Sequence, residues 1–552
     1  MTDVYDVCVV GAGPAGLAAS IQLAESGRRV ALVESGFDGF SENAQELSDA
    51  EVNTPHSHSA MQDAVCRRLG GTSAVWGGRC VPLDAIDFEK RDFITHSGWP
   101  IPPADLEPFY PAACEFLGVG PPAFDVASCT GLRTNNVPLS DGFVDANGIR
   151  ATQLERWSGY PHAWRRHRKE IIKSRSIELI AGFTCVGFSH EALGGSVKEG
   201  FLASTSPSVA GLRTVRAKVF VLACGGVEST RLILNSIADP QGLKLSAPNL
   251  VGRFYMGHPS GKIADIALDG DAMKTIYGFE KDHGVYVRRR ITFEPSVLRD
   301  ERLLNIAFWL DNPVLADPQH GSGVLSAAYL ALASPVLGKW LAPAAIRNKI
   351  LQATTSDARS HLINCVRDPV RAIAFSSRYA YQRYMAVPRI PGFFTYNRAN
   401  RYALHFHSEQ VPNWNSRIEL ADAVDRLGMR RARITLEWSW QDIDSVIRAH
   451  DQLDRRLREQ RIGKLIWRTA RTSLENSIRE QSVDGYHQLG TLRAGKSPES
   501  GVTDGFGRLH GTNNVFVASS AVFPTSGQAN PTLTLVAFAY RQSKHIDALL
   551  RS

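Results

Sequence analysis

The 552-residue sequence has few cysteines, and none of its eight forms a C-x-x-C pair. This absence excludes zinc ribbons, thioredoxin-like dithiols and haem attachment through C-x-x-C-H. Glycine follows no period and heptads are missing, which excludes collagen and coiled coils. The N-terminus has no basic n-region or twin arginine, and the apolar stretch 324–338 is shorter than the ~20 residues of a membrane span. Isolated thiols fit a reducing compartment, so we expect a cytoplasmic protein.

The composition is that of a large globular protein, with 43% apolar and 21% charged residues. At about 150 residues per domain the length suggests three or four domains. The net charge of +7 is concentrated on residues 321–400, which hold ten Lys and Arg against two acids. No nucleic-acid-binding motif accompanies that charge, so we expect no nucleic-acid partner.

The first 34 residues carry a nucleotide-binding pattern. A valine-rich run, Tyr5 to Val10, is typical of a buried parallel strand. The glycines of Gly11-Ala-Gly13-Pro-Ala-Gly16 then permit a tight turn and close approach of a pyrophosphate to a helix N-terminus. Glu34 ends the next strand, where a carboxylate can bind a ribose diol. The acid favours FAD or NAD over NADP.

A second segment separates FAD from NAD. Residues 217–226 (AKVFVLACGG) form another apolar run that ends in small residues, as expected where a flavin fold returns to its first sheet. No second G-x-G-x-x-G lies between a strand and a helix, so a built-in NADPH site is not expected. This disfavours monooxygenases and disulfide reductases.

Longer motifs spread over the chain carry a more specific signal. The first motif occupies residues 67–101 and begins with RRLGGTSAVWGG. It is followed by NLVGRFYMGHP (249–259), EQVPNWNSRIEL (409–420), YHQLGTLRAG (486–495) and a C-terminal stretch (501–541). In this order they resemble the glucose-methanol-choline (GMC) oxidoreductases. The resemblance is strongest to the bacterial sugar and glycoside branch, with its pyranose oxidases and C-glycoside 3-oxidases. It is weakest over residues 260–400.

The resemblance implies an α/β fold in which a discontinuous Rossmann-like FAD-binding domain joins an α+β substrate domain with an antiparallel sheet. We expect the FAD-binding domain at 1–95, 170–258 and 485–552. The substrate domain then takes 96–169 and 259–484, including a basic helical insert at about 321–395. The C-terminal sequence itself predicts a strand followed by a helix with proline in its first turn.

Two residues match the family's catalytic positions. His487 heads HQLGTLRAG and would accept the hydroxyl proton while hydride leaves the carbon for flavin N5. Asn530, in GQANPT, stands where the family carries histidine or asparagine; it could orient the substrate oxygen but cannot act as a base. A structural histidine, and an asparagine that caps the following helix, are the alternatives.

The resemblance also implies the cofactor contacts. Val75 replaces the histidine to which pyranose oxidases attach their flavin, so we expect non-covalent FAD. Ser519 stands where many members have an aspartate beside the pyrophosphate, and Val186 matches the segment facing adenine unless it is simply a core valine. The complete expected set is Gly11, Gly13, Ala15, Glu34, Gly71, Thr72, Ser73, Gly77, Gly78, Val186, Ala223, Ser519 and Thr532.

Substrate contacts are less marked in the sequence. His258, in GHP, could line the pocket or be an ordinary turn histidine. Strand alternation places His405, His407 and Glu409 on one face, with Gln410 on the other as a candidate contact to a sugar hydroxyl. A His-His-Glu face invites a metal site, but it also fits a solvated face, and we expect no metal.

The basic insert admits three interpretations. It could be a lid with an apolar core face and solvated arginines, or a peripheral membrane contact through residues 324–389. It could also capture an anionic substrate or carrier.

We expect an FAD-dependent enzyme that oxidises a secondary hydroxyl of a sugar or glycoside to a ketone. Oxygen or a separate carrier would take the electrons. The alternatives are a dehydrogenase of a lipid-linked or other alcohol, and a flavin-containing lyase, since fold alone does not fix chemistry.

Overall fold

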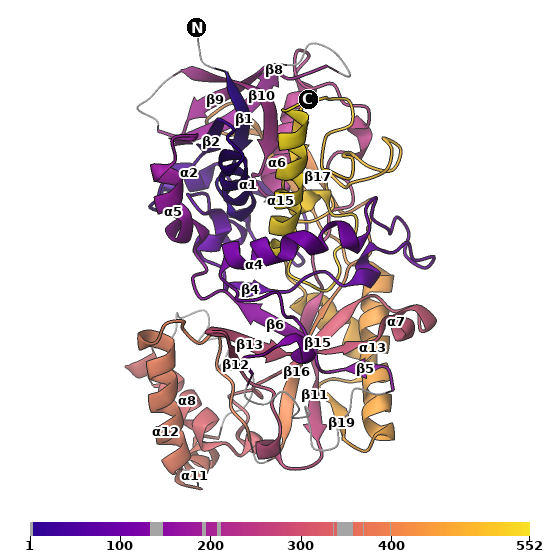
Figure 1. Ribbon diagram of the computed structural model, residues 1–552. Helices are drawn as coiled ribbons and strands as arrows, with labels where there is room; N and C mark the ends of the chain where they lie inside the picture. Colours follow the sequence, from indigo (N-terminus) through magenta and orange to yellow (C-terminus); the bar gives the residue numbers. More distant parts are fainter. Residues whose placement is uncertain are drawn as a thin grey trace.

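The computed structural model describes residues 4–132, 147–189, 195–206, 211–334, 336–338, 357–367, 369–397 and 399–552. Figure 1 shows a nucleotide-binding half at the top and a second half with its own sheet below. The predicted fold class is confirmed: a Rossmann-like domain with a parallel sheet is joined to a domain with an antiparallel sheet.

The upper half is built on a seven-stranded sheet in which β1 (Tyr5–Val10) lies between β2 and β10. Both neighbours run parallel to β1, so residues 217–222 return to the first sheet as predicted. Strand β20 extends the parallel part beside β10, whereas β9 and β8 follow in antiparallel order. The bounds are β2 (Val30–Glu34), β7 (Ile177–Ala181), β8 (Phe183–Ser189), β9 (Glu199–Ser204), β10 (Leu212–Leu222) and β20 (Val515–Val517).

Helices cover both faces of this sheet. Val7 and Val9 of β1 pack in one core with α1 (Pro14–Glu25) and α15 (Thr532–Leu549). Cys8 and Val10 face the opposite core, which contains α6 (Gly226–Ala238). Burial on both faces explains why β1 is an uninterrupted apolar run.

The domain boundaries stay a prediction. Two helices assigned to the substrate domain pack in the nucleotide-binding half. α4 (Tyr110–Leu117) and α5 (Ala163–Lys173) pack in the core of α1 and α15, although residues 96–169 were assigned to the substrate domain. The strands of the upper sheet all come from the three expected FAD-binding pieces.

The lower half contains a six-stranded antiparallel sheet. Its central strand β16 (Arg401–Ser408) lies between β11 and β15, and α13 (Trp440–Glu459) and α14 (Leu474–Gln481) pack in the same core. The other strands are β5 (Ile149–Arg150), β11 (Ser260–Leu268), β14 (Ile291–Phe293), β15 (Ile306–Asp311) and β19 (Gly463–Trp467). The short helix α7 (Pro295–Asp300) follows β14.

Two small sheets connect the halves. One pairs β4 (Arg79–Cys80) with β6 (Leu154–Trp157), followed by β13 (Val285–Arg289) and β12 (Glu280–Asp282). The other pairs β3 (Ala50–Val52) with β18 (Arg430–Thr435) and β17 (Arg417–Val424). The short helices α2 (Glu42–Glu46) and α3 (Met61–Ala64) flank β3. Residues from the N-terminal piece therefore pair directly with strands far along the chain.

The basic insert is helical where it is described, and it lies at the lower left of Figure 1. Its helices are α8 (Gly323–Ala333), α11 (Ala358–Arg367), α12 (Pro369–Ala380) and a π-helical turn, Tyr381–Met385. Residues 335, 339–356 and 368 of the predicted insert lie outside the described residues. Among the helices that can be examined, none is long and apolar enough to cross a membrane.

Candidate active site

A cavity of about 630 Å³ lies between the N-terminal and C-terminal segments. Its wall contains both predicted catalytic residues, His487 and Asn530, and most of the predicted cofactor residues. The latter are Gly11, Gly13, Ala15, Glu34, Gly71, Thr72, Ser73, Gly77, Gly78, Ala223 and Thr532. One cavity therefore joins the nucleotide-binding turn to the candidate catalytic histidine.

The glycine turn requires glycine for two different reasons. A Cβ on Gly11 would lie 2.5 Å from the Ala223 carbonyl oxygen, so the turn could not pack against β10. A Cβ on Gly13 would meet no protein atom within 4 Å and would project from the wall of the cavity. Gly13 thus keeps space open for a ligand rather than for the fold.

Two helices begin at the cavity without a side-chain cap. α1 starts at Pro14, and α15 starts at Thr532, and in neither does the N-cap residue contribute a side-chain hydrogen bond. Their first N–H groups and dipoles therefore remain available to an anion such as a pyrophosphate.

Glu34 is almost fully buried at the end of β2. Its carboxylate accepts hydrogen bonds of 2.8 Å from the backbone N–H groups of Ala12 and Gly36, which fixes it beside the glycine turn. Burial raises the pKa of Glu34 and these backbone hydrogen bonds oppose that shift. Its remaining acceptor capacity faces the cavity, as expected of a residue that binds ribose hydroxyls.

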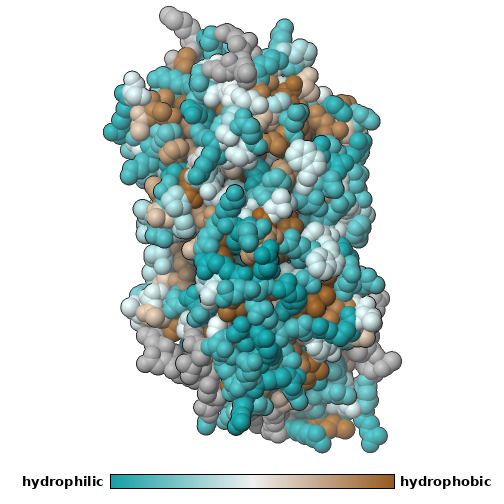
Figure 2. Space-filling view, turned by 90° about the vertical axis from the view of Figure 1, so that its right-hand side faces the viewer, coloured by the Kyte–Doolittle hydropathy of each residue, from teal (hydrophilic) through white to brown (hydrophobic). Residues whose placement is uncertain are grey.

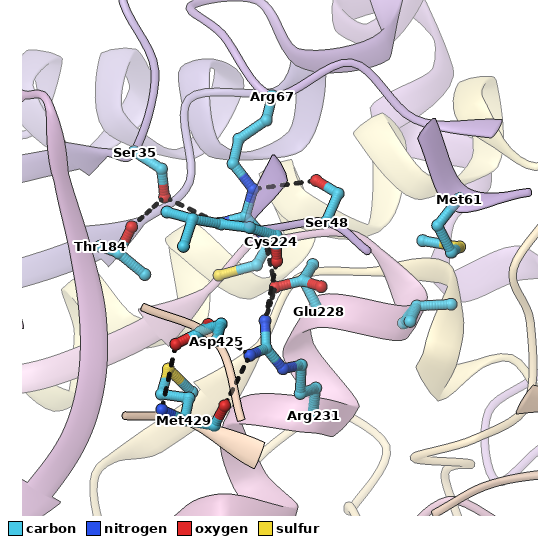
Figure 3. A network of polar contacts seen from close by, with 12 residues as sticks. Ser35, Ser48, Met61, Arg67, Thr184, Cys224, Glu228, Arg231, Asp425 and Met429 are labelled. Atoms are coloured by element: carbon cyan, nitrogen blue, oxygen red, sulfur yellow. Dashed lines mark hydrogen bonds and ion pairs between the residues drawn. The ribbon is translucent and has the colours of Figure 1, made fainter. Parts of the chain in front are cut away.

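A polar network that the sequence analysis did not identify forms another part of the wall (Figure 3). Arg67 donates to Ser48 Oγ at 3.0 Å and Ser35 Oγ at 3.1 Å, and it pairs with Glu228 of α6.

Behind this wall the fully buried Arg231 pairs with Glu228 and with Asp425. Asp425 belongs to the connection between β17 and β18, so the network anchors that connection to α6. Removal of one partner would leave a buried charge, which typically costs 3–5 kcal/mol.

The catalytic end is organised by a carboxylate that the sequence analysis also missed. Asp484 Oδ2 accepts from His487 Nδ1 at 3.3 Å, while the Asn530 amide donates to His487 Nε2 at 2.8 Å. With the proton on Nδ1, the Nε2 atom carries the lone pair of a base. The only local clue in the sequence was an acid three residues before the histidine.

Asp484 is held firmly in its ionised form. Oδ1 accepts from the backbone N–H groups of Tyr486 and His487, and Oδ2 accepts from the N–H of His258. Burial by itself would raise its pKa, but His487 and His258 keep the pKa of Asp484 well below the usual range.

His258, His407 and His487 form a group that we call the histidine cluster. The His258 and His407 rings stack at 4.3 Å, and the His258 and His487 rings meet edge-on at 4.7 Å. Burial lowers the pKa values of His258 and His407, which favours the neutral form of both imidazoles. His258 supports Asp484 from behind and is not part of the cavity wall.

Three predicted contacts lie elsewhere. Gln410 is buried away from the cavity. Its amide oxygen accepts from the Gly257 N–H and its NH₂ group donates to the Glu437 carbonyl, each at 2.8 Å. Ser519 bonds the N–H of Ala521, while Ala518 and Ser520 line the cavity. Val186 packs against the sheet core, and the preceding residues 183–185 line the cavity instead.

The predicted His-His-Glu face does not assemble as a ligand set. Glu409 is buried in a bidentate ion pair with Arg91, and the His405 ring stacks on Trp309 at 4.3 Å. Over the described ranges, the group with suitable metal-ligand spacing is the histidine cluster, whose ligand atoms lie within 4.8 Å of one another. Both ring nitrogens of His487 already have protein partners there.

The residues present fit FAD. The open space at Gly13, the uncapped helix N-termini and Glu34 suit a pyrophosphate and a ribose, and His487 and Asn530 occupy the same cavity wall.

Comparisons with known proteins agree with this arrangement. A family model described as "FAD binding domain" matches residues 6–82, which contain the glycine turn and Glu34. A model described as "GMC oxidoreductase" matches residues 412–539, which contain His487 and Asn530.

Two curated relatives align over nearly the full chain. A 6'''-hydroxyparomomycin C oxidase from Streptomyces lividus is 24% identical, over 99% of this chain and 92% of that protein. A paromamine 6'-oxidase from Streptomyces fradiae is 22% identical, over 98% and 91% respectively.

A solved structure shares the fold over its whole length. It is a fungal aryl-alcohol oxidase with a TM-score of 0.55, 12% identity and full coverage of both chains. The two family models, and the cavity that joins their matched segments, indicate an FAD-dependent oxidoreductase of the GMC type that acts on CH–OH groups.

Proposed function

We propose that this enzyme oxidises a hydroxyl group of a sugar or glycoside, with His487 as the base. The observation that carries the catalytic part is the Asp484–His487–Asn530 array, in which His487 and Asn530 lie on the wall of the cavity that also contains the glycine turn and Asp484 lies behind them. FAD, when bound, supplies the acceptor for the hydride that leaves the alcohol carbon.

The proton is handled by the chain's own residues. Asp484 keeps the proton of His487 on Nδ1, which leaves Nε2 to accept the proton of the substrate hydroxyl. In the resting site the Asn530 amide donates to that same Nε2 atom. A bound hydroxyl would take this place, and the Asn530 N–H would then donate to the substrate oxygen.

Asn530 also offers an acceptor. Its Oδ1 atom is buried and has no hydrogen-bond partner in the structure. An unpaired buried amide oxygen is costly, and a neighbouring hydroxyl of a polyol substrate could satisfy it. This arrangement favours a substrate with more than one hydroxyl over a simple alcohol.

Two positions of oxidation compete. The branch resembled by the sequence motifs favours a secondary hydroxyl and a ketone product. The names of the two relatives refer to a 6' position and to a 6'''-hydroxy compound. Carbon 6 of a hexose carries the exocyclic primary alcohol. We propose the secondary hydroxyl as the first candidate and the primary hydroxyl of an amino sugar as the second.

The cofactor is proposed to bind without a covalent bond, because Val75 offers no nucleophilic atom at the position where pyranose oxidases attach flavin. Denaturation with acid should release the flavin into the supernatant, and flavin that stays with the precipitate contradicts this point. The electron acceptor is oxygen or a separate carrier.

Anaerobic stopped-flow absorbance of the flavin band tests the proposal. Free hexoses, glycosides, amino sugars and simple alcohols are mixed with the holoenzyme, and the 6-deoxy analogue of the best substrate follows. Bleaching by the 6-deoxy analogue places oxidation on a secondary carbon, whereas its failure places it on C6. Readmission of air separates an oxidase from a dehydrogenase.

The His487→Ala variant is the matched control. It should retain FAD but lose flavin reduction, because Asn530 cannot act as a base. If no sugar bleaches the wild-type flavin, the sugar proposal is wrong. A lipid-linked alcohol or a lyase reaction would then be tested next.

A further inference from the structure

Exposed apolar side chains are concentrated on one part of the molecule. Of the 23 large hydrophobic side chains that are exposed among the described residues, ten lie within 336–387. We call these ten the apolar patch: Val336, Leu337, Leu362, Ile363, Val366, Ile373, Tyr381, Tyr384, Met385 and Val387. Single exposed apolar residues need no explanation, but a gathering of this size marks an interaction site.

Helix α11 of the insert is polar inside and apolar outside. His361 is fully buried, bonds Ser326 Oγ at 3.0 Å and stacks on Tyr329 at 4.3 Å. On the outer face of the same helix, α11, Leu362 is 55% exposed and Val366 is 77% exposed. An ordinary surface helix has the reverse arrangement. The prediction of a lid with an apolar core face therefore does not describe α11.

Cationic side chains are interspersed with the apolar patch. Arg359 and Arg367 are exposed near the two ends of α11, beside its exposed aliphatic residues. Arg378, Arg383 and Arg389 are exposed among the tyrosines that follow. Tyrosine and arginine beside aliphatic side chains are typical of a surface that enters the lipid headgroup region.

The insert lies at a corner of the molecule, where a membrane surface could contact it. In Figure 1 α8, α11 and α12 form the lower left corner, away from the nucleotide-binding half. Figure 2 looks onto the opposite side, where α13 lies, and the lower part of that face is predominantly hydrophilic.

We propose that the insert docks the enzyme peripherally on a membrane that contains anionic phospholipid. The apolar patch enters the headgroup region, and the arginines bind the lipid phosphates. Charge complementarity selects the anionic lipid, since residues 321–400 hold ten Lys and Arg against two acids. This interaction is independent of the reaction at His487.

Flotation of the FAD-loaded enzyme with liposomes tests the proposal. Vesicles of phosphatidylcholine alone are compared with vesicles that contain one quarter phosphatidylglycerol. The enzyme should float with the anionic vesicles at low salt and remain at the bottom with neutral vesicles. Its absence from the anionic vesicles at low salt would overturn the proposal.

Matched variants locate the contact. The pair Val366→Asn with Ile373→Asn should lower the partition coefficient about tenfold or more, because two apolar side chains no longer leave water. The control pair Leu212→Asn with Val424→Asn changes side chains that are 68% and 57% exposed outside the insert, and should leave flotation unchanged. Equal losses in both pairs would contradict a specific contact.

The cationic part has its own test. Arg367→Gln should lower partition to anionic vesicles about fivefold at low salt, and the effect should fade at high salt. All variants are first checked for flavin content and for flavin reduction, which should remain normal. If wild type is a dimer in size-exclusion chromatography and the Val366/Ile373 pair makes it monomeric without affecting flotation, the patch binds a second copy and the membrane proposal is wrong.

Discussion

Asp484→Asn changes only one atom of the carboxyl group, yet it should disable the proposed base. Asp484 accepts four hydrogen bonds, from three backbone N–H groups and from His487 Nδ1 at 3.3 Å. An amide has a single acceptor oxygen, so its NH₂ group must face donors on one side. If the NH₂ group faces His487, the imidazole proton moves to Nε2 and the lone pair needed for the substrate is lost.

The expected effect is a kinetic one. A positioned general base contributes about 10² to 10⁴ in rate, and the flavin reduction rate should fall within that range. FAD content should remain near that of wild type, because Asp484 is not part of the cavity wall. Combining the variant with His487→Ala should cause no further loss, since both changes remove the same function.

A control separates this effect from a loss of structure. Asp442 is another buried acidic residue whose side-chain oxygens accept from backbone N–H groups, of Val411 and Ser439, and it does not line the cavity. Asp442→Asn should weaken the fold but leave the reduction rate per bound flavin unchanged. A normal reduction rate in Asp484→Asn would refute the orienting role of this carboxylate.

Other predictions concern the cofactor, the pH dependence of stability and metals. Gly13→Val should fold but bind little FAD, because its side chain enters the cavity, whereas Gly39→Val adds a side chain in open space outside the cavity and should keep its flavin. Equal flavin content in both variants would contradict the cradle. Burial raises the pKa of Asp442 to about 7, so the native state holds a proton that the unfolded chain releases near pH 4. Stability from this group is therefore complete below about pH 4 and is lost as the pH rises through 7, by about 4 kcal/mol in all. Thermal unfolding from pH 4 to 8 should show a smaller decline in Asp442→Asn than in wild type, and identical slopes would contradict this assignment. Dialysis against EDTA should leave flavin reduction unchanged, whereas a loss restored by Zn²⁺ would identify the histidine cluster as a metal centre.

Local patterns predicted the central elements of the nucleotide-binding half. The valine run at 5–10 and the glycine turn predicted β1 and the start of α1, and the apolar run at 217–226 predicted the strand that returns beside β1. These features are short and contiguous, and the physical requirement of each is visible in its own residue types. The antiparallel sheet and the fold class came from the resemblance instead, because its strands lie far apart in the sequence.

Contacts between distant segments were beyond such patterns. Glu228 and Asp425 are 197 positions apart and each resembles an ordinary surface acid until Arg231 brings them together. The position of Gln410 outside the cavity wall was beyond such patterns for the same reason. Strand alternation could not show that Gln410 lies beyond the end of β16, nor that Gly257 and Glu437 would occupy its amide.

Asp484 shows which kind of functional residue a motif leaves out. His487 was identified because its neighbours match a family pattern, and an isolated acid three positions earlier carries no pattern of its own. Its importance comes from convergence: His258 from a segment more than 200 residues away and His487 from its own turn meet the same carboxylate oxygen. A carboxylate whose pKa is lowered by two histidines, behind the proposed base, is recognised by this geometry alone. The same reasoning applies to the insert, where composition left a lid and a membrane contact open. The inward position of His361 and the outward position of Val366 favour the membrane contact, since a helix that covered a core would have placed them the other way round.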